Sequence, residues 1–256
     1  MTTTTTLNLE KQPDVENPTL VEGLAGIGHI GRNVVSYLAE HLDAEKIGEL
    51  QSDHFPPYTI VKDDKTIEKI KNSIYQLHTD NGDYILVEGN AQAQTPEGHH
   101  EVARKLIKFA EENDISRVLT IGGYGTGDVV EDPDVFGAVT TEDLKEDYSD
   151  NGIQFEHDVD QIVGVSGLLL GQAQDKEIPG ICLLGETPGF LLSDPKSTEA
   201  VLKVVESIMN VDLDYSELDD KVEESQEVLK KLQNMKNQQS PDQDQQQSGN
   251  DLGYIG

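Results

Sequence analysis

The chain has 256 residues, 35% of them hydrophobic, and a formal net charge of −30 at pH 7, which is enough length for a complete core but an unusually acidic surface. The single cysteine excludes a disulfide framework or a cysteine-rich zinc site, and neither a membrane-length apolar run nor a signal-peptide pattern is seen, so we expect a cytoplasmic protein with no membrane partner. The charge repels nucleic acid and favours a cytoplasm rich in salt, as in halophilic archaea, because salt screens self-repulsion.

Strand and helix patterns alternate from the first residues onward. TTTTTLNLE predicts an edge strand and TLVEGL a second strand, which is followed by a glycine-rich turn and a helix over roughly residues 28–41. KIGELQS predicts a strand that ends at FPPY. The next stretch is ambiguous, because YTIV and SIYQLH look extended whereas KTIEKIKN also fits a short helix. YILVEG then has the length of a buried strand.

The alternation continues through the second half. TPEGHHEVARKLIKFAEEN predicts a helix in which Thr95 is the N-cap and Pro96 the first helical residue. RVLTIGG, DVFGAVT and IPGICLLGE predict strands, whereas DQIVGVSGLLLGQAQ and DPKSTEAVLKVVESIMN predict helices. This order predicts an α/β fold with a mostly parallel sheet covered by helices on both faces, a three-layer sandwich.

Three segments differ in composition. Residues 1–212 carry the α/β pattern, and residues 213–237 form a polar helical pattern with a thin apolar stripe suited to the body or to a neighbouring copy. Residues 238–256 are rich in Gln, Asp and Ser, which predicts a flexible tail, yet the tail ends with apolar side chains. We therefore expect a core domain, a C-terminal helical segment and a disordered tail with an apolar tip.

The stretch GLAGIGHIG places Gly26, Gly28 and Gly31 in the G-x-G-x-x-G spacing of a dinucleotide-binding turn. Such a site also needs an acidic residue about 20 positions later, and Glu49 and Asp53 lie near that distance. The alternative is that glycine is needed where strand and helix backbones approach closely, with no nucleotide present. The motif alone leaves both interpretations open.

Five motifs occur in order along the chain: GLAGIGHIGRNVVSYLAEHL, VEGNAQAQTPEG, RVLTIGGYGTG, VGVSGLLLGQAQ and LLGETPGFLLSDP. Together they resemble the proteasome assembly chaperone 2 family as it occurs in archaea, over about residues 17–218. The resemblance implies a sandwich similar to the nucleoside-phosphorylase fold, a homo-oligomer, and a chaperone or activator that contacts the α-subunits of the proteasome core particle. It also implies that the glycine loop of Gly23, Gly26, Gly28 and Gly31 is structural and that no cofactor is bound.

Candidates for catalysis or metal binding are weak. His99–Glu101 contains three adjacent residues that could bind a metal, but neighbouring residues on a helix point about 100° apart and rarely share one ion. The imidazole within Glu156–Asp160 could act as a base, although such clusters arise by chance in an acidic chain. Ser166 lacks the spacing of a nucleophile elbow, and Cys182 lies in an apolar strand. We expect no catalytic residue and no metal site.

Loops at Glu88–Asn90, Gly122–Gly127 and Glu186–Gly189 all follow apolar strands. In a parallel sheet such loops gather at the carboxyl edge, where α/β proteins bind ligands. The preferred interpretation is a subunit interface. The alternative is a pocket for a small nucleoside-like molecule, which would make the chain a binding protein, a hydrolase or a phosphorylase.

The chain ends in DLGYIG. Proteins of the resembled family commonly end in a hydrophobic–tyrosine–any residue motif that inserts between neighbouring α-subunits of the proteasome. Here the tyrosine is third from the end rather than second, so the match is displaced by one residue. We expect the partner-binding residues to be those at the tip: Leu252, Tyr254, Ile255 and Gly256.

Overall fold

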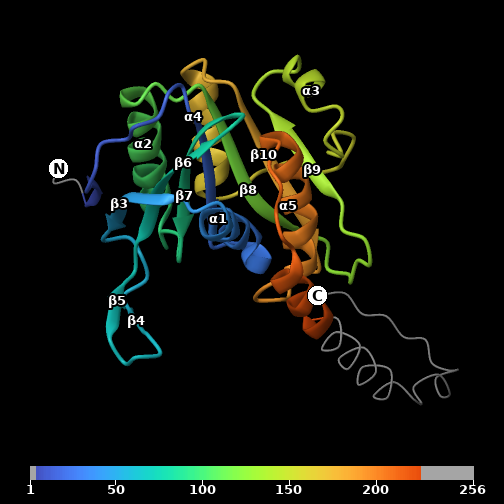
Figure 1. Ribbon diagram of the computed structural model, residues 1–256, viewed down its shortest axis with the longest axis horizontal. Helices are drawn as coiled ribbons and strands as arrows, with labels where there is room; N and C mark the ends of the chain where they lie inside the picture. The colour runs from blue at the N-terminus through green and yellow to red at the C-terminus, as the bar shows by residue number, and fades with distance from the viewer. Residues whose placement is uncertain (1–3, 226–256) are drawn as a thin grey trace, which may run out of the picture. The chain divides into compact units, whose positions relative to one another are not determined.

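The structure is a computed structural model that describes residues 4–225 (Figure 1). The chain divides into two compact units, Met1–Tyr215 and Ser216–Gly256. Of the second unit, residues 216–225 are described and are helical. Within the described residues no helix is both long enough and apolar enough to cross a membrane.

Unit Met1–Tyr215 is built on an eight-stranded sheet with the strand order β1-β3-β6-β7-β2-β8-β10-β9. The parallel pairings β7–β2, β2–β8 and β8–β10 form its centre, and antiparallel pairings flank them on both sides. The first strand lies at one edge, as its weak alternation predicts. The strands are β1 (Thr5–Leu9), β2 (Thr19–Leu24), β3 (Glu45–Ser52), β6 (Asn72–Thr79), β7 (Gly82–Gly89), β8 (Arg117–Gly125), β9 (Val135–Val139) and β10 (Gly180–Thr187).

Helices cover both faces of this sheet, so the expected three-layer α/β architecture is confirmed (Figure 1). One face is covered by α1 and α5, and the other by α2 and α4. The helical elements are the short 3-10 turn η1 (Ile27–His29) and the helices α1 (Ile30–His41), α2 (Pro96–Glu112), α3 (Leu144–Asp147), α4 (Val165–Asp175) and α5 (Pro195–Met209).

Two of the helices begin at side-chain caps. The Thr95 hydroxyl accepts a hydrogen bond from the Gly98 N–H, and Pro96 is the first residue of α2, as expected. The Asp194 carboxylate accepts one from the Ser197 N–H, and a proline again starts the helix. A capping side chain satisfies a backbone donor that the first turn leaves without a partner, so these residues define where α2 and α5 begin.

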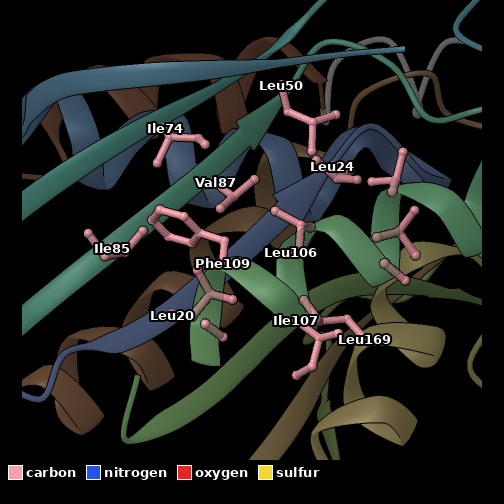
Figure 2. Packing of buried hydrophobic residues seen from close by; sticks show 14 of the residues in the cluster. Leu20, Leu24, Leu50, Ile74, Ile85, Val87, Leu106, Ile107, Phe109 and Leu169 are labelled. Atoms are coloured by element: carbon pink, nitrogen blue, oxygen red, sulfur yellow. The ribbon is translucent and has the colours of Figure 1, made fainter. Parts of the chain in front are cut away.

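The largest hydrophobic cluster lies between the sheet and the α2/α4 layer. Leu20, Ile85 and Val87 contribute from the strands, and Leu106 and Leu169 contribute from α2 and α4 (Figure 2). All five are fully buried. Burying a leucine or isoleucine side chain of this size contributes roughly 1.5–3 kcal/mol, so this layer supplies much of the driving force for folding.

Residues 58–71 form a hairpin, and the short-helix alternative for KTIEKIKN is wrong. Strands β4 (Thr59–Val61) and β5 (Ile67–Lys69) pair in antiparallel fashion as a separate two-stranded sheet. The turn between them is closed by the Asp64 carboxylate, which accepts hydrogen bonds from the Thr66 N–H and hydroxyl. Lys65 has a φ of +67° there, a left-handed conformation that a helix does not allow.

Candidate functional site

The carboxyl ends of the parallel strands β2, β7, β8 and β10 lie at one edge of the sheet, and the loops that follow them interlock there. The Thr126 N–H donates to the Thr187 carbonyl at 2.9 Å, which joins the loops after β8 and β10. The Asp194 N–H donates to the Gly28 carbonyl at 2.9 Å, which joins the loop after β10 to the glycine turn. The three loops therefore form one continuous surface.

Gln92, which follows β7, ties a fourth loop to the same edge. Its amide nitrogen donates to the Ala25 carbonyl at 3.0 Å, and its amide oxygen accepts from the Val165 N–H at 3.2 Å. Gln92 thus bridges the turn after β2 to the first turn of α4. This side chain lies within VEGNAQAQTPEG, but its bridging role depends on two contacts that are distant in sequence.

The glycine turn serves the packing of α1 on the sheet. A Cβ atom at Gly23 would lie 2.0 Å from the Gly31 carbonyl oxygen, and one at Gly31 would lie 2.2 Å from the Ile121 carbonyl oxygen. Gly28 has a φ of +61°, which favours glycine, and the helix consequently starts two residues later than expected, at Ile30. Gly26 is different, because a Cβ atom there would have no neighbour closer than 3.7 Å.

The acidic residues expected for a dinucleotide site do not lie beside this turn. Glu49 is on β3, which is separated from β2 by β6 and β7. Its carboxylate lies 2.9 Å from the Lys71 ammonium, and this contact lowers the pKa of Glu49. Asp53 follows β3 on the same distant side of the sheet, where its N–H donates to the Thr4 carbonyl. A ribose placed at the glycine turn would find neither carboxylate.

Glu101 and His157, from the metal and catalytic candidates, have structural partners. Glu101 accepts hydrogen bonds from the Thr4 and Thr5 hydroxyls, at 2.7 and 2.9 Å, which tie the edge strand to α2. His157 makes a 2.8 Å contact to the Gly137 carbonyl through Nε2 and accepts from the Val159 N–H through Nδ1, so no carboxylate orients it as a base. Over residues 4–225, no cluster of three or more His, Cys, Asp or Glu residues could hold a metal ion.

A buried polar row was not anticipated from the sequence. Glu22, Thr120 and Cys182 are opposite one another on β2, β8 and β10, and all three are completely buried on the face that α4 covers. Neither Glu22 carboxylate oxygen has a hydrogen-bond partner, and burial raises the pKa of Glu22 to about 8, an effect that the nearby Ser166 hydroxyl only partly offsets. The Cys182 thiol is buried as expected, which raises its pKa to about 12.

The edge surface exposes large apolar side chains. Phe190 and Leu192, in the loop after β10, are 59% and 78% exposed, and Ile27 in η1 is 47% exposed. These loops are adjacent, since a Cβ atom built on Gly125 would touch both Gly189 and Ile27. We call Ile27, Phe190 and Leu192 the carboxyl-edge patch. Exposed apolar groups gathered on interlocked loops are typical of an interaction surface.

The predicted partner-binding residues Leu252, Tyr254, Ile255 and Gly256 lie outside the described residues. The same is true of residues 226–237 of the predicted helical segment 213–237, whereas residues 216–225 are described as helix. The docking of the tail therefore stays a prediction from the sequence.

These features define a class of protein: a three-layer α/β sandwich whose strand-end loops interlock and carry exposed apolar side chains. The PAC2 family model matches residues 20–233, and the chain belongs to this family. The resemblance drawn from the five motifs is thereby confirmed.

Similar proteins support the same assignment. Pyrococcus furiosus PbaB, described as an archaeal proteasome activator, is 34% identical with a TM-score of 0.85, covering 90% of this chain and 99% of PbaB. P. furiosus PbaA, described as an archaeal homolog of proteasome-assembly chaperone, shares the fold at 24% identity and a TM-score of 0.74, with 91% and 93% coverage. Uncharacterized protein MJ1210 of Methanocaldococcus jannaschii is 37% identical, over 94% of this chain and 93% of that protein.

Proposed function

We propose that this chain is a non-enzymatic assembly chaperone or activator of the proteasome core particle, and that it forms a homo-oligomer that contacts the α-subunits of the particle. The observation that carries the proposal is the 34% identity to an archaeal proteasome activator over 99% of that protein, with a TM-score of 0.85.

The carboxyl edge supports an interaction role rather than catalysis. Its loops are tied to one another by hydrogen bonds of Asp194, Gln92 and Thr126, and it exposes the apolar side chains of the carboxyl-edge patch. A rigid surface of this kind loses little conformational entropy when a partner binds. The acidic charge is compatible with work in a salt-rich cytoplasm, where repulsion between copies is screened.

In this proposal the tail is the anchor. Leu252, Tyr254 and Ile255 follow a polar, Gln-rich stretch whose composition gives no reason to end in apolar residues. An apolar side chain would fill a pocket between α-subunits, and the terminal carboxylate would pair with a lysine. An oligomer would present several tails at once, which raises avidity by about 10²–10⁴-fold.

The test is co-sedimentation with core particles at high salt, comparing the full chain with a chain truncated after Asp251. We expect truncation to weaken binding by about 100-fold or more, because the multivalent anchor is lost. A matched control replaces Gln245, Gln246 and Gln247 by alanine, which alters the tail without touching its tip, and should bind like the full chain.

Other outcomes are equally informative. Retained binding after truncation would move the contact to the folded unit and overturn the tail mechanism. No binding by the full chain would overturn the proteasome role, and the nucleoside-binding alternative would then be tested by thermal shift. A ligand present at 100 times its dissociation constant adds about 2.7 kcal/mol to the stability of the native state.

A further inference from the structure

The hairpin of residues 58–71 exposes an apolar face. Val61 and Ile67 are directly opposite each other on β4 and β5, and they are 64% and 70% exposed. Thr59 and Lys69 form the next pair on the same face. Ile60, on the opposite face, packs against the main core cluster. One face of the hairpin is therefore held by the body, and the other presents two β-branched residues to solvent.

This hairpin is fixed in place by ion pairs. The Glu68 carboxylate lies 3.5 Å from the Lys62 ammonium and 3.2 Å from that of Lys71, and Lys71 also lies 2.9 Å from Glu49 on β3. Two-stranded hairpins are marginal by themselves, so these contacts and the packing of Ile60 explain why it is ordered. An ordered element with an uncovered apolar face is suited to docking.

The hairpin also differs from the rest of the chain in charge. The protein has 19 basic and 49 acidic residues, yet residues 58–71 contain four lysines and only three acids. Lys62 and Lys71 are engaged in the ion pairs above, whereas Lys65 and Lys69 make no ion pair with any residue among those described. The exposed face thus combines Val61 and Ile67 with unpaired positive charge, and it would be attracted to an acidic surface.

Such a surface exists on the same molecule, at the carboxyl-edge patch. The loop 126–134 runs beside the loop that carries Phe190 and Leu192, and it contributes Asp128, Glu131 and Asp132, all exposed. Lys196 approaches Asp132 at 4.0 Å, whereas Asp128 and Glu131 have no basic partner among residues 4–225. The patch therefore combines apolar side chains with unpaired negative charge, the complement of the hairpin.

The two surfaces share one edge of the sheet but are too far apart to meet within one chain. Strand β3 runs parallel to β7, since each pairs antiparallel with β6, so the hairpin that follows β3 stands at the carboxyl edge (Figure 1). Five inter-strand steps separate β3 from β10, which corresponds to about 24 Å. A two-fold rotation about the sheet normal would bring each hairpin opposite the patch of a second copy.

We propose that a second copy of this chain docks edge to edge, with Val61 and Ile67 of each hairpin packed on Ile27, Phe190 and Leu192 of the other copy, and with Lys65 and Lys69 facing Asp128 and Glu131. The contact is isologous, so it forms twice per dimer. It covers apolar area at a segment whose basic side chains face the acidic side chains of the other copy. This inference specifies an interface for the proposed homo-oligomer, but it stands without a role for the proteasome.

The first test measures mass against concentration by sedimentation of the purified full chain. The wild type should self-associate, and Ile67→Asp should raise the dissociation constant about tenfold or more, because an apolar anchor is replaced by a charge. The control Arg104→Glu/Lys108→Glu changes the net charge on exposed positions of α2, outside both surfaces, and should associate like the wild type.

A charge exchange tests the pairing itself. Lys65→Glu/Lys69→Glu and Asp128→Lys/Glu131→Lys should each lose self-association, since each places like charges opposite one another in both contacts. An equimolar mixture of the two variants should recover a heterodimer, because one contact is then native and the other is reversed but complementary. A variant that merely fails to fold would not be rescued by mixing.

Several results would overturn the inference. These are a wild type that stays monomeric at every concentration, unchanged association of Ile67→Asp, or a mixture that does not recover association. Because these measurements contain no core particle, their failure leaves the proposed binding to the core particle standing, although a monomeric wild type would remove the homo-oligomer from that proposal. Failure of co-sedimentation leaves this interface standing.

Discussion

The two faces of the central sheet are covered by helices in different ways. On the α1/α5 face the helix backbone approaches the strands directly, and Gly23 and Gly31 leave no room for a side chain between β2 and α1. On the α2/α4 face large side chains interdigitate, and they surround a buried carboxyl group, Glu22. Each face also carries a buried glutamate, but Glu88 on the α1 face has a cationic partner in Arg32, whereas Glu22 has none.

This difference shows two distinct ways in which one sheet limits sequence change. The α1 face tolerates no added volume at its closest point, because the neighbouring atoms belong to the backbone and cannot move aside. The α2/α4 face has ordinary side-chain packing, but its stability depends on the protonation of one residue. Substitutions at the closest point of the α1 face and substitutions of the buried glutamates should therefore differ in how much stability they cost. They should also differ in how that cost depends on pH.

The largest effect is expected from Gly23→Ala. The new Cβ atom would lie 2.0 Å from the Gly31 carbonyl oxygen and 2.6 Å from a methyl group of Val35. Separating α1 from β2 to relieve this contact should lower the free energy of unfolding by about 4 kcal/mol or more. Urea denaturation followed by circular dichroism would measure the loss.

The matched control is Gly171→Ala, on the exposed side of α4. A Cβ atom at Gly171 would have no neighbour within 4 Å, and alanine is favoured over glycine inside a helix by roughly 0.5–1 kcal/mol. This variant should be slightly more stable than the wild type. Equal stability of Gly23→Ala and the wild type would contradict the close packing of α1 on β2.

The second effect, in order of size, is the pH dependence that Glu22 imposes. Because burial raises the pKa of Glu22 from 4.5 to about 8 in the folded protein, the folded state keeps a proton that the unfolded state loses between these values. The contribution of this bound proton to the free energy of unfolding is fully present below about pH 4.5 and is lost as the pH rises to about 8. The cost reaches about 1.4 kcal/mol per pH unit in the middle of this window and is smaller near its two ends, so stability should fall by about 3.5 kcal/mol between pH 5 and pH 8.

Glu22→Gln keeps the shape of the side chain and removes the titration. Its free energy of unfolding should be less dependent on pH over this window, and at pH 8 the variant should be more stable than the wild type. Thermal or urea unfolding at several pH values and constant high salt would measure both curves. Parallel curves for the two proteins would show that Glu22 is not protonated in the folded state.

The smallest effect is expected from Arg32→Met on the opposite face. The Arg32 guanidinium lies 3.4 Å from the Glu88 carboxylate, and it counteracts the rise in the pKa of Glu88 that burial causes. Arg32 is partly exposed, so solvent screens the pair and its loss should cost only about 1 kcal/mol near neutral pH. The pH dependence of unfolding should steepen, because Glu88 would then resemble Glu22. A variant with an unchanged pH profile would argue against that comparison.

Much of the fold was accessible from the sequence, because its signals are local. Thr95-Pro96 and Asp194-Pro195 mark helix starts through capping and proline geometry, and the alternation of apolar strands with amphipathic helices predicts the three layers. The five ordered motifs predicted the family for the same reason, since four of them combine a strand end with its loop and the fifth, VGVSGLLLGQAQ, contains the start of α4. Local patterns of this kind do not depend on which strands pair.

The features that were missed depend on pairing. Glu22 in TLVEGL resembles a solvent-facing residue until the register places it beside Thr120 and beneath α4. KTIEKIKN fits a helix or a strand equally well, and the pairing of Val61 with Ile67 decides between them. The carboxyl-edge patch likewise brings together Ile27 and Phe190, which are far apart in the chain.

The burial of Cys182 has a practical consequence. Thiol-reactive dyes and cross-linkers attack the thiolate, and this sole cysteine is fully buried with its pKa raised to about 12, so the native chain should be inert to them. A cysteine introduced at any exposed position would then be the one reactive thiol, with no need to remove the natural residue. The protein is thus ready for site-specific labelling, and fluorescence energy transfer between labelled copies could follow their association in real time.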